Sequence, residues 1–437
     1  MLACFGKRIN VSMAMQLSAC IIACCALVTG APLDSREDRV EAVRRTSGFV
    51  ALWDFVERVD GKFAAHQARG DRHDFRLDAV NYVRDYWAEG RAATYADFPL
   101  LGRGPFGQAV RFQAEAERDF RPCLLVPRDR LHNSGLDVKG PGRSGSMVAW
   151  VIRESGNHAI AGIWHEGTDL QGGAGAVKRV EQGRRQYALF AGLAANNGAA
   201  AVHVSENGGR SFGDKYARNL AVTPEVIPAV PADSPAGVLD RAWSVVAFSF
   251  DNKRNTVTAY LDGKANDYWV EDPAHHPFFQ WPCKGWQQAQ WRKIPGLQAG
   301  EDPAFPAEQF YEPPEGKPSS RRVVSETADT RIEVQQFEFT RVRVTLRKDA
   351  MGRFRTPVGR ELIALRANPF WFAHDLYAPG GLEDGGPFTI GRVIHTSRSV
   401  GFTGYIGGVA VFSRALGAGE MARLAAIAKS GPIPAPR

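Results

Sequence analysis

Cysteine is scarce in this sequence outside the first thirty residues. Four of the six cysteines lie within residues 1–31, so that only Cys123 and Cys283 remain in the rest of the chain. Two cysteines are too few for a cysteine-ligated metal cluster. They could instead form a disulfide that closes a loop of about 160 residues and contributes roughly 4–5 kcal/mol. Two separately buried thiols are the alternative, and the sequence leaves both open.

Long hydrophobic runs are also absent beyond the start of the chain. The one such run extends from about Val11 to Thr29 and follows Lys7 and Arg8. A basic start followed by an apolar stretch and small residues is typical of an export signal. We therefore expect residues 1–31 to be a signal peptide or a lipoprotein leader, and the protein to be secreted or held in the cell envelope. Membrane attachment would involve only a lipid or an uncleaved N-terminal anchor helix.

A strong excess of charge of one sign is missing as well. The chain has 54 Lys and Arg against 47 Asp and Glu, and the net charge of +7 includes Lys7 and Arg8 in the predicted leader. Arginines are scattered along the sequence, which predicts a mixed-charge surface and no nucleic-acid-binding groove. A weak preference for acidic glycans stays open.

Helical periodicity is rare, whereas short stretches rich in β-branched and aromatic residues recur between turn signals. This spacing is typical of an all-β sandwich. We expect one convincing helix, at 418–429, where apolar residues recur at helical spacing. The predicted strands cover 49–56, 108–113, 123–126, 146–153, 159–165, 186–193, 199–204, 243–251, 256–261, 331–346, 361–366, 388–392 and 402–412. The pair 243–251 and 256–261 should form an antiparallel hairpin.

Between residues 264 and 321 the strand pattern disappears and proline, glutamine and tryptophan become frequent. Four of the ten tryptophans, Trp269, Trp281, Trp286 and Trp291, fall in this predicted insertion, and Trp371 lies in a second aromatic patch. Indole faces suit the apolar face of a sugar ring, so these five residues are the candidate ligand-binding residues. The alternative is an aromatic core of the insertion itself, and both interpretations stay open.

Several motifs follow one another in the order seen in one family of β-sandwich proteins. They are LWDF at 52–55, GQAVRF at 107–112, WSVVAF at 243–248, AYLDG at 259–263, FTIGR at 388–392 and GYIGGVAVFSRAL at 404–416. With these motifs the chain resembles the laminin-G-like domains, which share the concanavalin A-type jelly roll. The resemblance covers most of residues 48–429, and the segment 264–321 lies outside it.

This resemblance implies a two-sheet antiparallel jelly-roll sandwich with a long insertion and a short C-terminal helix. It also implies an exported, non-catalytic protein that recognises an extracellular glycan or protein. Many relatives use acidic residues near the termini to hold a structural calcium ion. Here Gly407 or Gly408 stands where the closing segment usually carries one of those acids, which weakens the expectation of calcium. No other cofactor is expected, and the sequence defines no metal ligands.

A divergent glycoside hydrolase of the concanavalin A-like glucanase type is the alternative function. Such enzymes carry two catalytic glutamates in the pattern E-x-D-x-x-E on one strand. Glu333 and Glu338 have this spacing, but Gln335 replaces the aspartate. The segment also lies after the predicted hairpin 243–261, whereas in those enzymes the motif precedes the equivalent hairpin. Without a bulge, residues five apart on a strand face opposite sides. The binding function is therefore preferred over catalysis.

Overall fold

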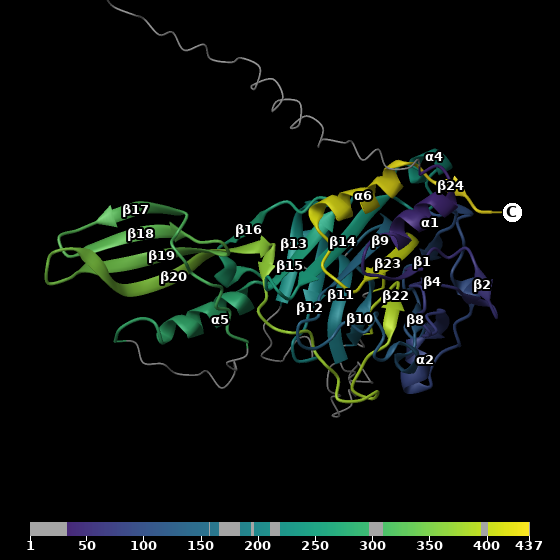
Figure 1. Ribbon diagram of the computed structural model, residues 1–437, viewed down its shortest axis with the longest axis horizontal. Coiled ribbons are helices and arrows are strands. Elements are labelled where there is room, and N and C mark those ends of the chain that lie inside the picture. The colour runs from purple at the N-terminus through teal and green to yellow at the C-terminus, as the bar shows by residue number, and fades with distance from the viewer. Residues whose placement is uncertain are drawn as a thin grey trace, which may run out of the picture.

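The computed structural model describes residues 33–156, 158–165, 184–193, 196–209, 219–296, 309–394 and 401–436. A broad body of two packed sheets carries a narrow arm that projects from one side (Figure 1). The predicted all-β sandwich is confirmed. The predicted leader lies outside the described residues. Among the helices within those ranges, none is long and apolar enough to cross a membrane.

The first sheet of the body has eight strands. In spatial order they are β21 (Phe370–Trp371), β15 (Thr256–Leu261), β14 (Ser244–Asp251), β9 (Gly145–Arg153), β23 (Gly404–Phe412), β1 (Phe49–Trp53) and β4 (His66–Gln67), and β7 (Val110–Phe112) also pairs with β23. All pairings in this sheet are antiparallel. The predicted hairpin is confirmed, because β14 and β15 pair from Val246 opposite Leu261 to Asp251 opposite Thr256.

The second sheet of the body has seven strands. Their order is β13 (Asn219–Val226), β12 (Asn196–Val204), β11 (Arg184–Leu193), β10 (His158–His165), β22 (Phe388–Ile390), β8 (Pro122–Val126) and β5 (Asp78–Asn81). Two short pairs lie at the periphery: β2 (Arg58–Val59) with β3 (Lys62–Phe63), and β24 (Ile433–Pro434) with β6 (Arg103–Gly104).

The main core lies between these two sheets, because each strand alternates its side chains between two faces. Trp53 of the eight-stranded sheet stacks on Phe388 of the seven-stranded sheet at a centroid distance of 5.1 Å. Tyr187 contacts Phe248 across the same interface at 5.9 Å. These aromatic rings are buried.

Two helices cover the outer face of the eight-stranded sheet, α1 (Arg36–Arg44) and α6 (Ala418–Lys429). The apolar stripe of α6, which includes Met421 and Leu424, is buried with Trp150 and Trp243 in a second core. The predicted C-terminal helix is thus confirmed. The other helices of the body are short: α2 (Tyr82–Trp87), η3 (Tyr95–Asp97), α3 (Arg128–Leu131) and α4 (Ala236–Leu239).

The arm is built around a five-stranded antiparallel sheet. Its strands, in pairing order across the sheet, are β16 (Tyr268–Glu271), β20 (Phe354–Asn368), β19 (Thr340–Lys348), β18 (Thr330–Gln336) and β17 (Ser320–Glu326). The arm also contains η4 (Pro273–His275) and α5 (Gln280–Trp291). The insertion therefore does not end at residue 321: the strands predicted at 331–346 and 361–366 belong to the arm. We define the arm as residues 268–368.

The arm and the body share one continuous core at their junction. Phe279 of the arm lies 6.3 Å from Phe370 of β21, and Tyr311 stacks on the same ring at 5.3 Å. The buried side chain of Asn368 accepts a hydrogen bond from the Ala259 N–H at 2.9 Å and donates one to the Ala259 carbonyl at 3.0 Å. One amide side chain thereby satisfies both backbone groups of a residue in β15, and fixes the arm to the body.

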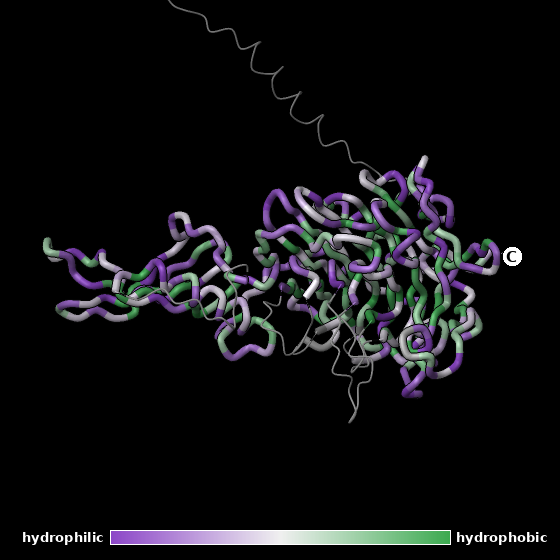
Figure 2. Tube along the Cα trace, turned by 90° about the horizontal axis from the view of Figure 1, so that it is seen from below, coloured by the Kyte–Doolittle hydropathy of each residue, from purple (hydrophilic) through white to green (hydrophobic). Residues whose placement is uncertain are grey.

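Figure 2 shows hydrophobic segments gathered inside the body, while the arm is mostly hydrophilic with short hydrophobic stretches. The arm is more hydrophilic because it is thinner than the body. A single sheet with one helix on one of its faces buries far less apolar surface than two sheets packed face to face.

Candidate functional site

The outer face of the seven-stranded sheet, which points away from the eight-stranded sheet, can be read from the strand register. Tyr187 faces the core, so its sequence neighbour Ala188 faces outward. A row of directly paired residues then crosses five strands on the outer face, formed by His203, Ala188, Gly162, Thr389 and Leu125. All five are buried or nearly so.

An aromatic and cationic stack lies near one end of this outer face. The indole of Trp164 stacks on the imidazole of His203, with centroids 4.7 Å apart and planes 23° from parallel. The Arg185 guanidinium lies over the same indole at 5.2 Å. All three side chains are buried, which strengthens a cation–π contact because water no longer competes for the charge.

An open cavity of about 420 Å³ lies on the same face, toward the edge of the sheet formed by β8 and β5. Val80 and Leu125 line it from β5 and β8, while Leu382 and Glu383 line it from the loop that precedes β22. Its volume falls within the range of small-molecule binding sites. The other residues that line it are Tyr82, Asp85, Pro127, Arg128, Arg184, Gly385, Pro387 and Ile394.

One charged group of this cavity, the guanidinium of Arg128, is held in place by a buried ion pair. Arg128 donates two hydrogen bonds to Asp137, at 2.8 and 3.0 Å, and Lys139 lies 2.7 Å from the same carboxylate. Burial by itself would raise the pKa of Asp137, but the hydrogen bonds from Arg128 and Lys139 outweigh it and hold the pKa below its ordinary value. Asp137 is therefore ionised at neutral pH and fixes the Arg128 guanidinium.

The loop that carries Leu382 and Glu383 packs closely on this guanidinium. A Cβ atom at Gly385 would lie only 2.2 Å from Arg128 Nε, so glycine is required for the approach. Asp85, which also lines the cavity, has its pKa raised by partial burial. The cavity thus offers apolar walls together with charged groups of both signs, a combination that binds small polar molecules or polar side chains.

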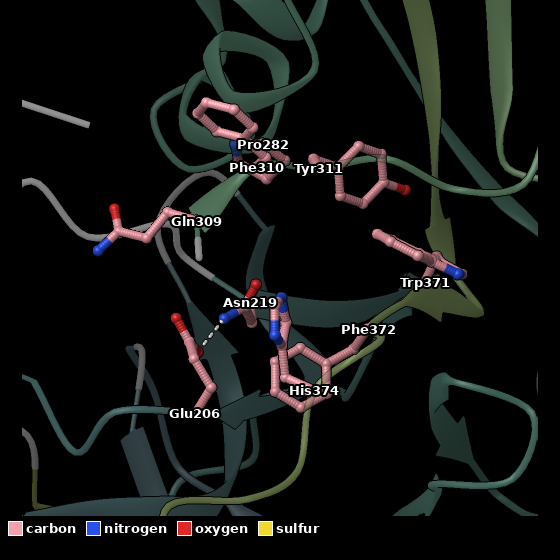
Figure 3. A pocket seen from close by; sticks show the side chains of 9 residues that line it. All are labelled: Glu206, Asn219, Pro282, Gln309, Phe310, Tyr311, Trp371, Phe372 and His374. Carbon is pink, nitrogen blue, oxygen red and sulfur yellow. Dashed lines mark hydrogen bonds between the residues drawn. The ribbon is translucent and has the colours of Figure 1, made fainter. Parts of the chain in front are cut away.

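Two other cavities are smaller. One, of about 220 Å³, is lined by Phe112, Glu115, Phe120 and neighbouring residues. The other lies at the junction of arm and body, where Tyr311 and Pro282 face Trp371 and His374 (Figure 3). Its volume of about 10 Å³ has room for no more than a single water molecule, so it is a packing defect of the junction.

The five candidate tryptophans do not form one surface. Trp281, Trp286 and Trp291 lie on α5, Trp269 on β16 and Trp371 on β21. Trp286 is only 1 % exposed and Trp371 only 9 % exposed, so both belong to the shared core. Trp269, Trp281 and Trp291 are half-buried. Arg360 lies over the Trp286 ring at 5.5 Å and Arg341 over the Trp269 ring at 5.2 Å.

The two glutamates of the hydrolase alternative lie in the arm. Glu333 is buried on β18 and accepts a hydrogen bond from Gln335 Nε2 at 3.0 Å, whereas Glu338 is exposed in the turn after β18 ends. Neither residue is on a strand of the two-sheet body or lines any of the three cavities described above. Their spacing therefore does not reproduce the paired carboxylates of a glucanase.

The two cysteines outside the predicted leader are both free thiols, so the disulfide alternative does not apply to this structure. Cys123 is buried in β8 of the body and Cys283 lies on α5 of the arm. Burial raises the pKa of both thiols, that of Cys283 to about 11. These are unreactive, packed side chains at neutral pH.

Within the described ranges, no three His, Cys, Asp or Glu side chains are grouped so that they could hold a metal ion. Gly407 and Gly408, where the resemblance to laminin-G-like domains led us to expect an acidic residue, are tightly enclosed. A Cβ at Gly407 would lie 2.8 Å from Trp243, and one at Gly408 would lie 2.7 Å from Phe106. A carboxylate side chain cannot be accommodated at either position without moving these rings.

Sequence reasoning missed the cavity on the outer face. Val80, Leu125, Arg184 and Leu382 come from four distant segments, and none belongs to a recognisable motif. Val80 and Leu125 share an outward position on their strands, but this position can be recognised only when the register of the sheet is known.

No family model matches this chain, and no curated protein matches it by sequence. Among solved structures, domain 4 of AbnA, a GH43 extracellular arabinanase from Geobacillus stearothermophilus in complex with arabinotriose, matches over 87 % of this chain and 98 % of its own, with 10 % identity and a TM-score of 0.36. A structure of botulinum neurotoxin type C, whose cell entry depends on interaction with two ganglioside molecules, matches over 89 % of this chain, with 8 % identity and a TM-score of 0.33. The binding domain of botulinum neurotoxin DC in complex with rat synaptotagmin II matches over 88 %, with 7 % identity and a TM-score of 0.31.

The chain spans about half the length of the two toxin structures, 53 % and 52 %. All three likenesses have TM-scores too low to carry an argument about ligand or activity. The fold assignment rests instead on the strand order of this chain itself.

Proposed function

We propose that this chain is an exported, non-catalytic binding protein of the laminin-G-like type that recognises an extracellular glycan or protein. The observation that carries the proposal is the open cavity of about 420 Å³ on the outer face of the seven-stranded sheet. Its apolar walls and its charged groups, of which Arg128 is fixed by Asp137, suit one ring of a glycan or one polar side chain of a protein. A secreted or envelope-bound location follows from the basic and apolar residues 1–31.

The structural support for binding rather than catalysis is the position of the charged groups. Arg128 is already neutralised by Asp137 beneath the cavity, and Glu333 and Glu338 lie in the arm. In this proposal the cavity is a recognition site whose charges orient a ligand. Binding through one such site should be weak, because a small ligand gains little once ordering and desolvation are subtracted.

A glycan array with the full-length protein, run with calcium and with a chelator, tests the proposal. The variant Leu382→Trp places an indole at the mouth of the cavity, where Leu382 is 48 % exposed. The matched control is Leu100→Trp, at a residue that is 45 % exposed and lies outside this cavity. We expect Leu382→Trp to weaken binding at least tenfold, Leu100→Trp to have no effect, and calcium to make no difference. Equal binding by both variants would show that the cavity is not the site.

A further inference from the structure

The positive charge of the chain is concentrated on the sheet of the arm. Residues 320–368 hold eleven Lys and Arg against six Asp and Glu, an excess of five. Residues 33–437, without Lys7 and Arg8, hold 52 against 47, which is also an excess of five. The remainder of the chain after the predicted leader is therefore neutral overall. Arginines that are scattered in the sequence are brought together by the antiparallel pairing of β17 to β20.

The two faces of this sheet differ in what covers them. Val342, Val344 and Leu346 of β19 point to the face on which α5 packs, since Arg360, paired opposite Val344, reaches Trp286 and Gln290 of α5. Val342 and Val344 are buried there. The alternate residues of β19 must point to the opposite face.

That opposite face carries a line of arginines. Arg341, Arg343 and Arg347 alternate along β19, and Arg322 of β17 joins them because it and Arg343 are both paired with Val334. Arg322, Arg343 and Arg347 are exposed. We call these four residues the basic face. Arg341 to Arg347 span about 20 Å at the rise of an extended strand.

Only part of this charge is neutralised by neighbouring carboxylates. Glu271 lies 2.5 Å from Arg341, and Glu361 lies 2.5 Å from Arg343. Among the described residues, no carboxylate pairs with Arg322 or Arg347. Both Glu271 and Glu361 are more than half exposed, so these surface pairs are weak and can be exchanged for a ligand anion.

We propose that the basic face binds a linear acidic polysaccharide, whose carboxylate or sulfate groups pair with successive arginines along β19. This inference rests on the proposed function and extends it by naming a ligand class and a second surface. Ten of the eleven cationic residues in 320–368 are arginine, and the planar guanidinium binds carboxylate or sulfate through two parallel hydrogen bonds. A line of charges about 20 Å long suits a linear polymer better than a single sugar.

The composition of the face argues against other polyanions. The one aromatic ring that we place on it, Trp269, is covered by Arg341 at 5.2 Å, so no free ring is offered for stacking of nucleobases. The apolar residues between the arginines, Ile332 and Val334, are half-buried, so the face offers little apolar surface for insertion into a membrane. An acidic peptide would gain most from side-chain pockets, and the three cavities described above are not lined by these arginines.

The test is binding of the full-length protein to immobilised polygalacturonate and heparin, with neutral dextran, polyglutamate, duplex DNA and phosphatidylserine vesicles as competing classes. The test variant is Arg343→Gln with Arg347→Gln. The control is Arg44→Gln with Arg423→Gln, which removes the same charge from exposed positions on α1 and α6. We expect the test variant to weaken binding to the acidic polysaccharides at least tenfold and the control to weaken it less than twofold. Binding should also fall as salt is raised, because exposed ion pairs are screened.

Equal losses in the two variants would overturn the proposal, since the effect would then come from net charge alone. Tighter binding to polyglutamate, DNA or vesicles than to both polysaccharides would also overturn it. The cavity variant Leu382→Trp separates this proposal from the proposed function. If acidic polysaccharides do not bind but an array ligand is lost in Leu382→Trp, the basic face is wrong and the cavity stands. If polysaccharide binding depends on Arg343 and Arg347 and not on Leu382, the basic face stands without the cavity.

Discussion

Replacement of Asn368 by alanine should loosen the attachment of the arm to the body. The Asn368 side chain is fully buried and makes three hydrogen bonds, two with the backbone of Ala259 and one with the carbonyl of Asn266 at 3.0 Å. The variant leaves the N–H and the carbonyl of Ala259 buried without these partners. Each such group costs about 1–3 kcal/mol, so we expect Asn368→Ala to lower the free energy of unfolding by roughly 2–6 kcal/mol.

Urea denaturation followed by tryptophan fluorescence measures this loss. The control is Asn266→Ala, in the same region of the chain, because its side chain is exposed and makes a surface hydrogen bond with Glu225. We expect a change within about 0.5 kcal/mol for this control, as for most surface substitutions. Because arm and body share one core, the transition of Asn368→Ala should also remain single. An unchanged urea midpoint in Asn368→Ala would refute the inference that this amide joins the two parts.

Four further predictions follow from the described contacts. Trp286→Ala should lower the free energy of unfolding by about 3–5 kcal/mol, measured by the same denaturation, because Trp286 is the buried tryptophan of α5 and its loss leaves a cavity in the core. A shift below 1 kcal/mol would contradict this burial. The protein should release no reducing sugar from β-glucans, so that wild type and Glu333→Gln both give the value of the blank. If wild type releases reducing sugar and Glu333→Gln does not, the hydrolase alternative is restored. The pKa of Asp137 is lower in the folded than in the unfolded protein, so the stability that its ionised carboxylate contributes should be present at neutral pH and be lost as the pH falls below about 4. The difference in unfolding free energy between wild type and Asp137→Asn should therefore be larger at pH 7 than at pH 3. Ellman's reagent should detect two thiols in the unfolded, unreduced protein once residues 1–31 are removed, and a count of zero would show a disulfide. In the folded protein at pH 8, Cys283 should react slowly because its pKa is raised to about 11.

Local patterns in the sequence were sufficient for the fold class and for several elements. The hairpin of β14 and β15 and the helix α6 were predicted because their signals are complete within short segments. In the hairpin, two alternating stretches flank a polar turn. In α6, apolar residues recur at helical spacing within one segment of twelve residues.

The extent of the arm could not be predicted in the same way. Strands β18, β19 and β20 have the same two-residue alternation as the strands of the body, and the alternation does not specify which sheet a strand joins. The predicted insertion therefore ended at residue 321, where regular strands resume. Only the pairing of β16 with β20 shows that they belong with the segment before them.

The candidate site was less accessible to sequence reasoning than the fold. The tryptophans at 269–291 stood out by number, but whether an indole is exposed depends on neighbours such as Phe370 and Arg360, which are distant in the sequence. The alternation of Arg341, Arg343 and Arg347 was readable as one face of a strand, yet its significance depends on α5 covering the other face.

The sequence by itself determined the all-β class, the hairpin, the C-terminal helix and the leader-like start, because each depends on the spacing of residues within one segment. The tertiary structure decided which strands form the arm, that Trp286 is a core residue, and where the cavity and the basic face lie. These features arise from pairings between distant segments, and their register sets which side chains share a face.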